Sequence, residues 1–368
     1  MQETCNMTSP TTVSHVAGEE ILSWAAKDES GHLAPLKISR RPTGPQDVRL
    51  KVMYCGICHS DLHQITNDWK NSSFPMVPGH EIVGVVTEIG LDVECFKVGQ
   101  HVGVGCMVRS CHACDSCQLG LEQYCPKVVW TYNSTDTADG TPTQGGYSAV
   151  MVCNQRFVLR MPPNLPLDAS APLLCAGITV WSPMKYFGMV EQGKHLGLVG
   201  LGGLGHMAIK FAKAFGMKVT VFSSSPGKEK EAREILGADN FIITKDNEKM
   251  KNAAKSIDYI IDTIPSAHCL DPYLALLKTN GKMVLLGVST EPVQISVYSL
   301  IFGRHFVGGS LIGGIAETQE MLDFCGAHNI TCMIEKIPIT YTNSAMDRLM
   351  KSDVKYRFVI DIENSLKE

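Results

Sequence analysis

A run of glycines at positions 200–205 constrains the fold of this chain more than any other feature. The segment Gly200-Leu-Gly-Gly-Leu-Gly205 follows an apolar stretch at 196–199 and opens a stretch at 205–216 with apolar residues at helical spacing. Strand, glycine-rich turn and helix in this order predict a βαβ unit that binds a dinucleotide, although glycines also occur in ordinary turns. The cofactor-binding residues predicted in this turn are Gly200, Gly202, Gly203, Leu204 and Gly205.

The segments after the glycine turn repeat the alternation of strand and helix. Apolar strands are predicted at 219–222, 241–243, 259–261 and 283–286, and a charged helix at 228–236. This alternation predicts a doubly wound parallel sheet with right-handed crossovers. Before about Cys175 the chain is β-rich, with strand patterns at 48–54 and 82–89. We therefore expect an α/β protein with a β-rich portion, a doubly wound portion to about Ile312, and a tail that joins either one.

Composition excludes several classes of protein. Of the 368 residues, 44% are hydrophobic and 19% are charged, which is a globular profile. The net charge of −4 provides no basic surface for nucleic acid, and no apolar run approaches the roughly 18 residues of a membrane span. Residues 1–15 show no signal peptide, so the 14 cysteines are expected in a reducing, cytoplasmic compartment. We therefore expect no nucleic-acid or membrane partner.

The residues after the second predicted strand of the doubly wound portion indicate which dinucleotide is bound. Ser223, Ser224 and Ser225 are followed by Lys228, with no acidic residue before Glu229. An NAD site places a carboxylate here to accept the ribose 2′-hydroxyl. Hydroxyls and an ammonium group instead suit a 2′-phosphate, so NADP(H) is the predicted cofactor. Alternatively the serines cap the helix at 228–236, and one serine could do both.

Four cysteines lie within fifteen residues, at Cys111, Cys114, Cys117 and Cys125. This spacing lets four thiolates reach the corners of a tetrahedron, which is the geometry of a closed, structural zinc site. An iron–sulfur cluster is the alternative, but its motif ends with a gap of about three residues, and here that gap is seven. We expect structural zinc to order the cysteine-rich loop 106–139.

A second possible metal site is dispersed along the chain. Cys58, His80 and Cys175 supply the three protein ligands of a zinc site with one open position. Spacing alone does not connect these residues. A lone Cys175 in an apolar segment is also typical of a buried small side chain, and His80 beside a glycine is also typical of a turn.

Several motifs together resemble one family. They are Cys55-Gly-Ile-Cys-His-Ser-Asp-Leu-His63, Pro78-Gly-His-Glu81, the four cysteines, Thr143-Gln-Gly-Gly-Tyr147, Ala171-Pro-Leu-Leu-Cys-Ala-Gly177, Gly200–His206 and Val354-Lys-Tyr-Arg-Phe-Val-Ile-Asp361. In this combination and order they resemble the zinc-containing medium-chain dehydrogenases/reductases, and within these the plant cinnamyl alcohol dehydrogenase branch. The similarity extends from about Leu33 to Asp361.

The resemblance implies a fold and an assembly. A GroES-like catalytic domain, residues 1–174 and 313–368, would surround a Rossmann NADP(H)-binding domain, residues 175–312. The substrate cleft would lie between the domains. Two chains would form a homodimer by pairing the edge strands of their Rossmann sheets.

The resemblance also implies roles for single residues. Cys58, His80 and Cys175 would hold a catalytic zinc ion, and Glu81 would enter its coordination sphere during ligand exchange. The remaining roles fall on one short segment. Ser60 would hydrogen-bond the substrate oxygen, Asp61 would orient the zinc-bound imidazole, His63 would relay a proton to solvent, and Asp68 could extend the relay.

The activity implied is a zinc-dependent alcohol dehydrogenase that transfers a hydride between NADP(H) and a small-molecule aldehyde or alcohol of the cinnamyl type. The alternatives are a reductase of a terpenoid or monoterpene indole alkaloid aldehyde or iminium, and a zinc-stabilised nucleotide-binding module without turnover. Positions resembling the substrate pocket are Gln64, Trp69, Asn71, Cys106, Trp130, Val288, Tyr298, Ile301, Phe302, Leu311 and Ile312. Val288, Ser310 and Ile312 are also expected to contact the cofactor.

Overall fold

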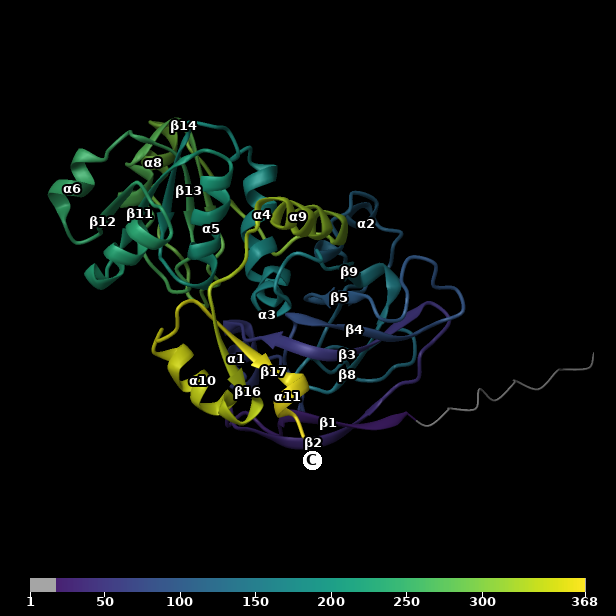
Figure 1. Cartoon of the computed structure of the whole chain (residues 1–368). Helices are drawn as coiled ribbons and strands as arrows, with labels where there is room; N and C mark the ends of the chain where they lie inside the picture. Colours follow the sequence, from purple (N-terminus) through teal and green to yellow (C-terminus); the bar gives the residue numbers. More distant parts are fainter. Residues whose placement is uncertain (1–17, 368) are drawn as a thin grey trace, which may run out of the picture.

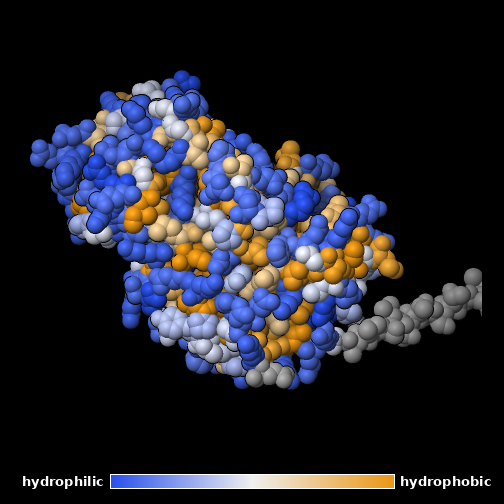
Figure 2. Space-filling view, viewed as in Figure 1, coloured by the Kyte–Doolittle hydropathy of each residue, from blue (hydrophilic) through white to orange (hydrophobic). Residues whose placement is uncertain are grey.

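The computed structural model describes residues 18–367, which fold into two domains, each built on its own sheet (Figure 1). The first residues, 1–17, which the sequence analysis included in the catalytic domain, lie outside the described part. No helix of the described residues is long and apolar enough to cross a membrane. On the face shown in Figure 2, apolar side chains gather along the boundary between the two domains.

The sheet of the doubly wound domain has six strands, all parallel, in the order β12-β11-β10-β13-β14-β15. This is the strand order of a Rossmann fold. Leu196, Leu198 and Val199 of β10 have no exposed surface, because helices cover both faces of the sheet. The strands are β10 (His195–Val199), β11 (Lys218–Ser223), β12 (Asn240–Ile243), β13 (Ile257–Asp262), β14 (Leu277–Leu285) and β15 (Phe306–Gly309).

All five strands predicted after residue 195 lie within this sheet, and these predictions are confirmed. The helix predicted at 228–236 differs from the structure. A short turn at Pro226–Lys228 leads into a single π-helical turn at Glu231–Ile235. The helices between residues 176 and 328 are α4 (Ala176–Tyr186), α5 (Gly203–Ala214), α6 (Asn247–Asn252), α7 (Asp271–Leu274), α8 (Val297–Ile301) and, in the returning segment, α9 (Ile315–His328).

An aromatic cluster joins α4, α5 and α9 on one side of the Rossmann sheet. The buried ring of Trp181 lies 5.4 Å from Phe211 of α5 and 4.8 Å from Phe324 of α9, measured between ring centroids. Large aromatic side chains of this kind dominate core energetics, so they fix the three helices against one another. Helix α9 belongs to the segment that returns from the Rossmann domain toward the β-rich domain.

The sheet of the β-rich domain has the order β16-β17-β3-β4-β5-β9, with β8 also pairing with β3. Strands from both ends of the chain therefore share one sheet, and the tail rejoins the β-rich portion. The exact boundaries at 174/175 and 312/313 stay predictions. The strands are β1 (Glu19–Ala26), β2 (Leu33–Arg40), β3 (Asp47–Gly56), β4 (Ile82–Ile89), β5 (His101–Val104), β6 (Met107–Arg109), β7 (Val129–Trp130), β8 (Val150–Asn154), β9 (Val158–Arg160), β16 (Ile334–Pro338) and β17 (Arg357–Asp361).

Short helices complete the β-rich domain. Strands β1 and β2 form a separate antiparallel hairpin, and β6 pairs with β7 beside the cysteine-rich loop. Helix α1 follows β3 directly and carries several predicted site residues at the domain boundary. The helices are α1 (His59–Ile65), α2 (Asp115–Gln118), α3 (Leu167–Ser170), α10 (Thr342–Met350) and α11 (Ile362–Ser365).

Candidate active site

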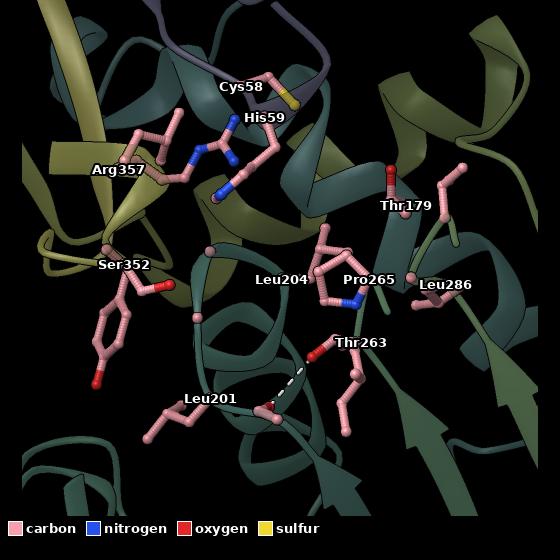
Figure 3. A pocket seen from close by; sticks show the side chains of 18 of the residues that line it. Cys58, His59, Thr179, Leu201, Leu204, Thr263, Pro265, Leu286, Ser352 and Arg357 are labelled. Carbon is pink, nitrogen blue, oxygen red and sulfur yellow. Dashed lines mark hydrogen bonds between the residues drawn. The ribbon is translucent and has the colours of Figure 1, made fainter. Parts of the chain in front are cut away.

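A cavity of about 460 Å³ lies between the two domains (Figure 3). Cys58, His59 and Arg357 contribute to it from the β-rich domain, and Leu201 and Leu204 face them from the Rossmann domain. The predicted site residues that line this cavity are Cys58, Ser60, His63, Trp69, Cys175, Gly200, Gly202, Gly203, Leu204, Lys228, Val288, Ser310, Leu311 and Ile312.

The dispersed metal ligands converge at one end of the cavity. One donor atom each of Cys58, His80, Glu81 and Cys175 lies within 4.8 Å of the others, and all four residues are buried. The local folds explain this: Cys58 precedes α1, His80 and Glu81 precede β4, and Cys175 precedes α4. The structure therefore brings together residues separated by more than a hundred positions.

The donor atoms of this cluster fit a zinc ion. The Sγ atoms of Cys58 and Cys175 are 3.9 Å apart, close to the ~3.8 Å edge of a tetrahedron with zinc–sulfur distances of about 2.3 Å. Nε2 of His80 and Oε2 of Glu81 are buried and have no hydrogen-bond partner, so both are free to bind a metal. The Cys175 thiol, acting against burial, lowers the pKa of Cys58 well below its usual value, which favours the thiolate that metals require.

Asp61 organises the backbone around the cluster. Its fully buried carboxylate accepts hydrogen bonds from the N–H groups of Cys58 (2.8 Å) and Gly79 (3.0 Å) and from the hydroxyl of Tyr147 (3.3 Å). Nδ1 of His80 lies 3.5 Å from the same carboxylate, which leaves Nε2 directed at the cluster. Burial raises the pKa of Asp61, and the Cys58 N–H bond opposes that rise.

Arg357 is a site residue that the sequence analysis missed. It begins strand β17, is buried, and forms an ion pair with Glu81. Burial alone lowers the pKa of Arg357, but the neighbouring Glu81 carboxylate outweighs burial and raises it. Burial also raises the pKa of Glu81, and the guanidinium opposes this. The sequence feature that could have indicated a buried charge is that Arg357 directly precedes the apolar run Phe358–Ile360.

Helix α1 presents Ser60 and His63 on one face, because residues three positions apart lie one above the other on a helix. Oγ of Ser60 is 3.6 Å from Sγ of Cys58. Nδ1 of His63 is 2.8 Å from Oδ2 of Asp68, whose side chain is 48% exposed. These residues thus form a row of polar groups from the buried cluster to the solvent.

The glycine-rich turn has the geometry of a phosphate-binding loop. Gly200 has φ of +88°, a conformation that glycine adopts without strain. A Cβ atom at Gly205 would lie 2.5 Å from the carbonyl oxygen of Gly200, whereas a Cβ at Gly202 would meet nothing within 4 Å. Helix and strand are therefore in close contact at Gly205, and the space above Gly202 is open. The N-terminus of α5 faces this space, which suits a pyrophosphate.

The residues predicted to select the cofactor follow β11. Ser223 is buried, while Ser224 and Ser225 are exposed, and none of the three lines the cavity. Lys228 does line it, and its ammonium group donates a 2.7 Å hydrogen bond to the carbonyl of Leu201. Burial lowers the pKa of Lys228. A cationic group therefore lies beside the glycine-rich turn.

The four clustered cysteines also meet in space. The donor atoms of Cys111, Cys114, Cys117 and Cys125 lie within 4.8 Å of one another, and Sγ of Cys111 is 4.0 Å from Sγ of Cys117. Backbone N–H groups of Ala113 and Cys114 donate to Sγ of Cys111 and lower its pKa to about 6. Thiolates held by backbone N–H groups fit a closed tetrahedral metal site.

The predicted substrate-pocket residues divide into two groups. Trp69, Val288, Leu311 and Ile312 line the cavity, and the Trp69 ring lies 5.2 Å from that of His63. Outside the lining are Gln64, Asn71, Cys106, Trp130, Tyr298, Ile301 and Phe302, and the pocket role of the whole set stays a prediction. Gln64 is buried and forms hydrogen bonds with Ser72 and Asn133. Trp130 lies in the β6–β7 ribbon. On and just after α8, the side chains of Tyr298, Ile301 and Phe302 are 72%, 67% and 82% exposed.

Two family models match the chain. The model described as an alcohol dehydrogenase GroES-like domain matches residues 44–163, and the model described as a zinc-binding dehydrogenase matches residues 203–327. Together with the two sheets, these matches confirm the predicted α/β fold, in which a GroES-like domain is combined with a Rossmann domain.

Similar proteins align with nearly the whole chain. A probable mannitol dehydrogenase from Medicago sativa is 61% identical over 342 residues, which are 93% of this chain and 95% of that protein. A probable cinnamyl alcohol dehydrogenase from Picea abies is 58% identical over 345 residues, covering 94% and 96% of the two chains. The 8-hydroxygeraniol dehydrogenase of Catharanthus roseus is 57% identical over 344 residues, covering 94% and 95%.

Solved structures share the architecture. A cinnamyl alcohol dehydrogenase from Sorghum bicolor has a TM-score of 0.93 and 53% identity, covering 95% of this chain and 100% of that chain. The CAD of Helicobacter pylori, complexed with NADP(H), has a TM-score of 0.87 and 42% identity, covering 94% and 99%. The names of the relatives and structures specify different alcohols.

Proposed function

Because the chain belongs to the zinc-dependent alcohol dehydrogenases, in their cinnamyl alcohol dehydrogenase-like branch, we propose that it interconverts a cinnamyl-type aldehyde and alcohol with NADP(H). The chain is an alcohol dehydrogenase that acts on a small-molecule alcohol or aldehyde. The observation that carries the proposal is the shared cavity: Cys58 and Cys175, Ser60 and His63, and the glycine-rich turn all line the same space.

Cys58, His80 and Cys175 would hold the catalytic zinc ion, and Glu81 would be its alternative ligand. Zinc in such a site supplies a Lewis acid that polarises a carbonyl group and stabilises negative charge on its oxygen. Arg357 holds Glu81 by an ion pair, so the carboxylate has a defined position beside the cluster. Asp61 keeps His80 oriented and positions Cys58 through its backbone N–H.

Residues of α1 would carry the proton. Ser60 would hydrogen-bond the substrate oxygen, and His63 would exchange the proton with solvent through Asp68, to which its Nδ1 is already close. Bound NADP(H) supplies the hydride donor or acceptor, and the protein positions it against the substrate. The N–H groups at the start of α5 would bind its pyrophosphate, with Val288, Ser310 and Ile312 along its remaining length.

Three features support NADP(H) over NAD(H). No carboxylate occupies the end of β11, Lys228 reaches into the cavity there, and the Helicobacter pylori relative was solved with NADP(H). A carboxylate would repel a 2′-phosphate, while an ammonium group attracts it. Ser223, Ser224 and Ser225 are proposed to contribute their hydroxyls to this phosphate.

The apolar wall of the cavity supports a cinnamyl-type substrate. Trp69, Leu286, Val288 and Leu311 offer aromatic and aliphatic surface, which suits a phenylpropenal better than a polyol. A terpenoid aldehyde is the second candidate, because such a substrate is equally apolar and the Catharanthus relative is an 8-hydroxygeraniol dehydrogenase.

A substrate panel tests the assignment. We would compare kcat/KM for coniferaldehyde and a monoterpene aldehyde with NADPH, and for mannitol with NADP+. The proposal requires coniferaldehyde to be the best of the three. A preference for the monoterpene aldehyde would establish the terpenoid alternative, and a preference for mannitol would refute both.

We further propose a cytoplasmic homodimer with the domain division 1–174 plus 313–368 and 175–312. Strand β15 is an edge of the Rossmann sheet; its first residue, Phe306, is 52% exposed, and Phe302 shortly before it is 82% exposed. Open strand edges with exposed apolar side chains favour pairing with a second chain. Six of the thirteen cysteines of the described part gather at the two proposed metal sites, a use of cysteine that is typical of proteins in a reducing compartment.

A further inference from the structure

The cysteine-rich lobe, defined as residues 111–125, docks on the segment through which the chain leaves the Rossmann domain. This crossing segment, residues 310–314, connects β15 to α9. In Figure 1 the lobe helix α2 lies beside α9, although the two are about two hundred residues apart in sequence. The proposed catalytic scheme gives the lobe no task beyond holding a metal.

Three close contacts join the lobe to the crossing segment and the first turn of α9. The hydroxyl oxygen of Tyr124 accepts a hydrogen bond from the N–H of Leu311 at 3.0 Å. Oε2 of Glu122 accepts one from the N–H of Ile315 at 3.1 Å. A Cβ atom on Gly314 would lie 1.8 Å from the carbonyl oxygen of Gly120, so the two backbones approach as closely as glycine allows.

The crossing segment forms part of the cavity wall. Ser310, Leu311 and Ile312 all line the cavity between the domains. Ile312 has φ of +36°, a conformation that is rare for a β-branched residue and persists only when the surroundings impose it. The two hydrogen bonds from the lobe lie on either side of Ile312, at Leu311 and Ile315.

Helix α9 is anchored to the β-rich domain at a second point. The amide of Gln319 accepts a hydrogen bond from the N–H of Arg160 at 2.9 Å and donates one to the carbonyl of Arg160 at 3.1 Å. Lobe and strand β9 therefore fix the first two turns of α9 from the same domain. The crossing segment, which precedes α9, is therefore held in place by contacts with the β-rich domain as well as by its connection to the Rossmann sheet.

We propose that Glu122 and Tyr124 are positioning residues, through which the metal-binding lobe sets the cavity wall at Ser310–Ile312. The lobe then contributes to substrate and cofactor binding without touching either. This inference rests on the proposed function only for its kinetic readout, since the position and mobility of the wall can be measured without substrate.

The test uses two variants that each remove one bond. Tyr124→Phe removes the acceptor for Leu311, and Glu122→Ala removes the acceptor for Ile315, while Glu122→Gln retains an acceptor oxygen. The matched control is Gln118→Ala, which changes the same lobe but removes no bond to residues 310–315. Zinc content is measured for every variant, and only proteins that keep the wild-type metal content are compared.

The first readout is amide hydrogen exchange of residues 310–315 in the zinc-loaded protein without cofactor. We expect Tyr124→Phe and Glu122→Ala to exchange about two- to tenfold faster there, since each loses one hydrogen bond. Glu122→Gln and Gln118→Ala should match the wild type. Unchanged exchange in both Tyr124→Phe and Glu122→Ala overturns the proposal. If Glu122→Ala loses its metal, the hydrogen exchange of Tyr124→Phe alone tests the proposal.

The second readout is the split between KM and kcat. A displaced wall weakens binding, so the KM for aldehyde or the Kd for NADPH should rise about two- to tenfold, with a smaller change in kcat. A lobe that serves stability alone would lower the Tm and leave both constants unchanged, and that result would also overturn the proposal. Wild-type inactivity on cinnamyl aldehydes would instead refute the substrate assignment and leave the exchange result standing.

Discussion

His206 should make this protein acid-sensitive in a way that a single substitution removes. The side chain follows the glycine-rich turn, has no exposed surface, and stacks on Tyr356 of the β-rich domain with ring centroids 4.9 Å apart. Its Nε2 accepts the N–H of Met333 at 3.3 Å, and Nδ1 has no partner. Burial lowers the pKa of His206 from 6.5 to about 3. The folded state therefore holds the neutral imidazole.

The sign of the effect follows from which state binds the proton. Between pH 7 and pH 5 the unfolded chain takes up a proton at this histidine and the folded chain does not, so stability falls as the pH falls. With pKa values of 6.5 unfolded and about 3 folded, the loss over this range is about 2 kcal/mol. This loss of stability hardly depends on the pKa of His206 in the folded state, provided that this pKa stays below about 4.

The assay is thermal unfolding of the wild type and His206→Gln at pH 7 and pH 5. Glutamine retains an acceptor for Met333 and does not titrate, so its Tm should fall by a few degrees less than that of the wild type. Other acid-labile groups, including the metal ligands, act in both proteins and cancel in the difference. The exposed residue His32 provides the control, His32→Gln. Equal losses of Tm in wild type and His206→Gln would refute the reasoning.

Four further outcomes are expected. Ser223→Asp should lower the NADPH/NADH ratio of kcat/KM about tenfold or more by placing a carboxylate near the 2′-phosphate, and unchanged selectivity would contradict the assignment of this strand end. Metal analysis should find about two zinc ions in the wild-type chain and about one in Cys58→Ser or Cys111→Ser. The Tm should fall further in Cys111→Ser than in Cys58→Ser, because the cysteine-rich lobe has a structural role. Equal Tm values in the two variants would refute this structural role. His63→Ala should slow turnover about tenfold or more and leave the Kd for NADPH unchanged, so a large loss of NADPH binding would disprove the relay role. Phe302→Glu should shift the mass measured by light scattering from dimer to monomer, and a persisting dimer would exclude the α8 face as the interface.

The parts of the fold that depend on local patterns were predictable from the sequence. Five of the six strands of the Rossmann sheet follow from short apolar runs, and the start of α5 follows from the glycine-rich turn, whereas β15 was not predicted. The four clustered cysteines needed only their spacing. The segment 228–236 was harder, because its charged residues have helical spacing but the structure forms a π-helical turn there.

Contacts between distant segments could not be predicted from the residues alone. Cys58 and Cys175 are 117 positions apart, and only the family resemblance connected them. Arg357 and Glu81 are 276 positions apart, and neither the spacing nor the residue type of Arg357 indicates its partner. The position of Tyr298 and Phe302 outside the cavity depends on how α8 is oriented, which no periodicity in five residues can specify.

The strand order of the β-rich sheet has a consequence for biosynthesis. Strand β17 lies between β16 and β3, and it carries Arg357, so the sheet lacks two neighbouring strands until residues 334–361 have left the ribosome. All six strands of the Rossmann sheet precede β16 in the chain, so that domain can fold while synthesis continues. Until residues 334–361 emerge, the nascent chain would thus expose an incomplete β-rich sheet, and the buried carboxylate of Glu81 would lack the counter-charge of Arg357.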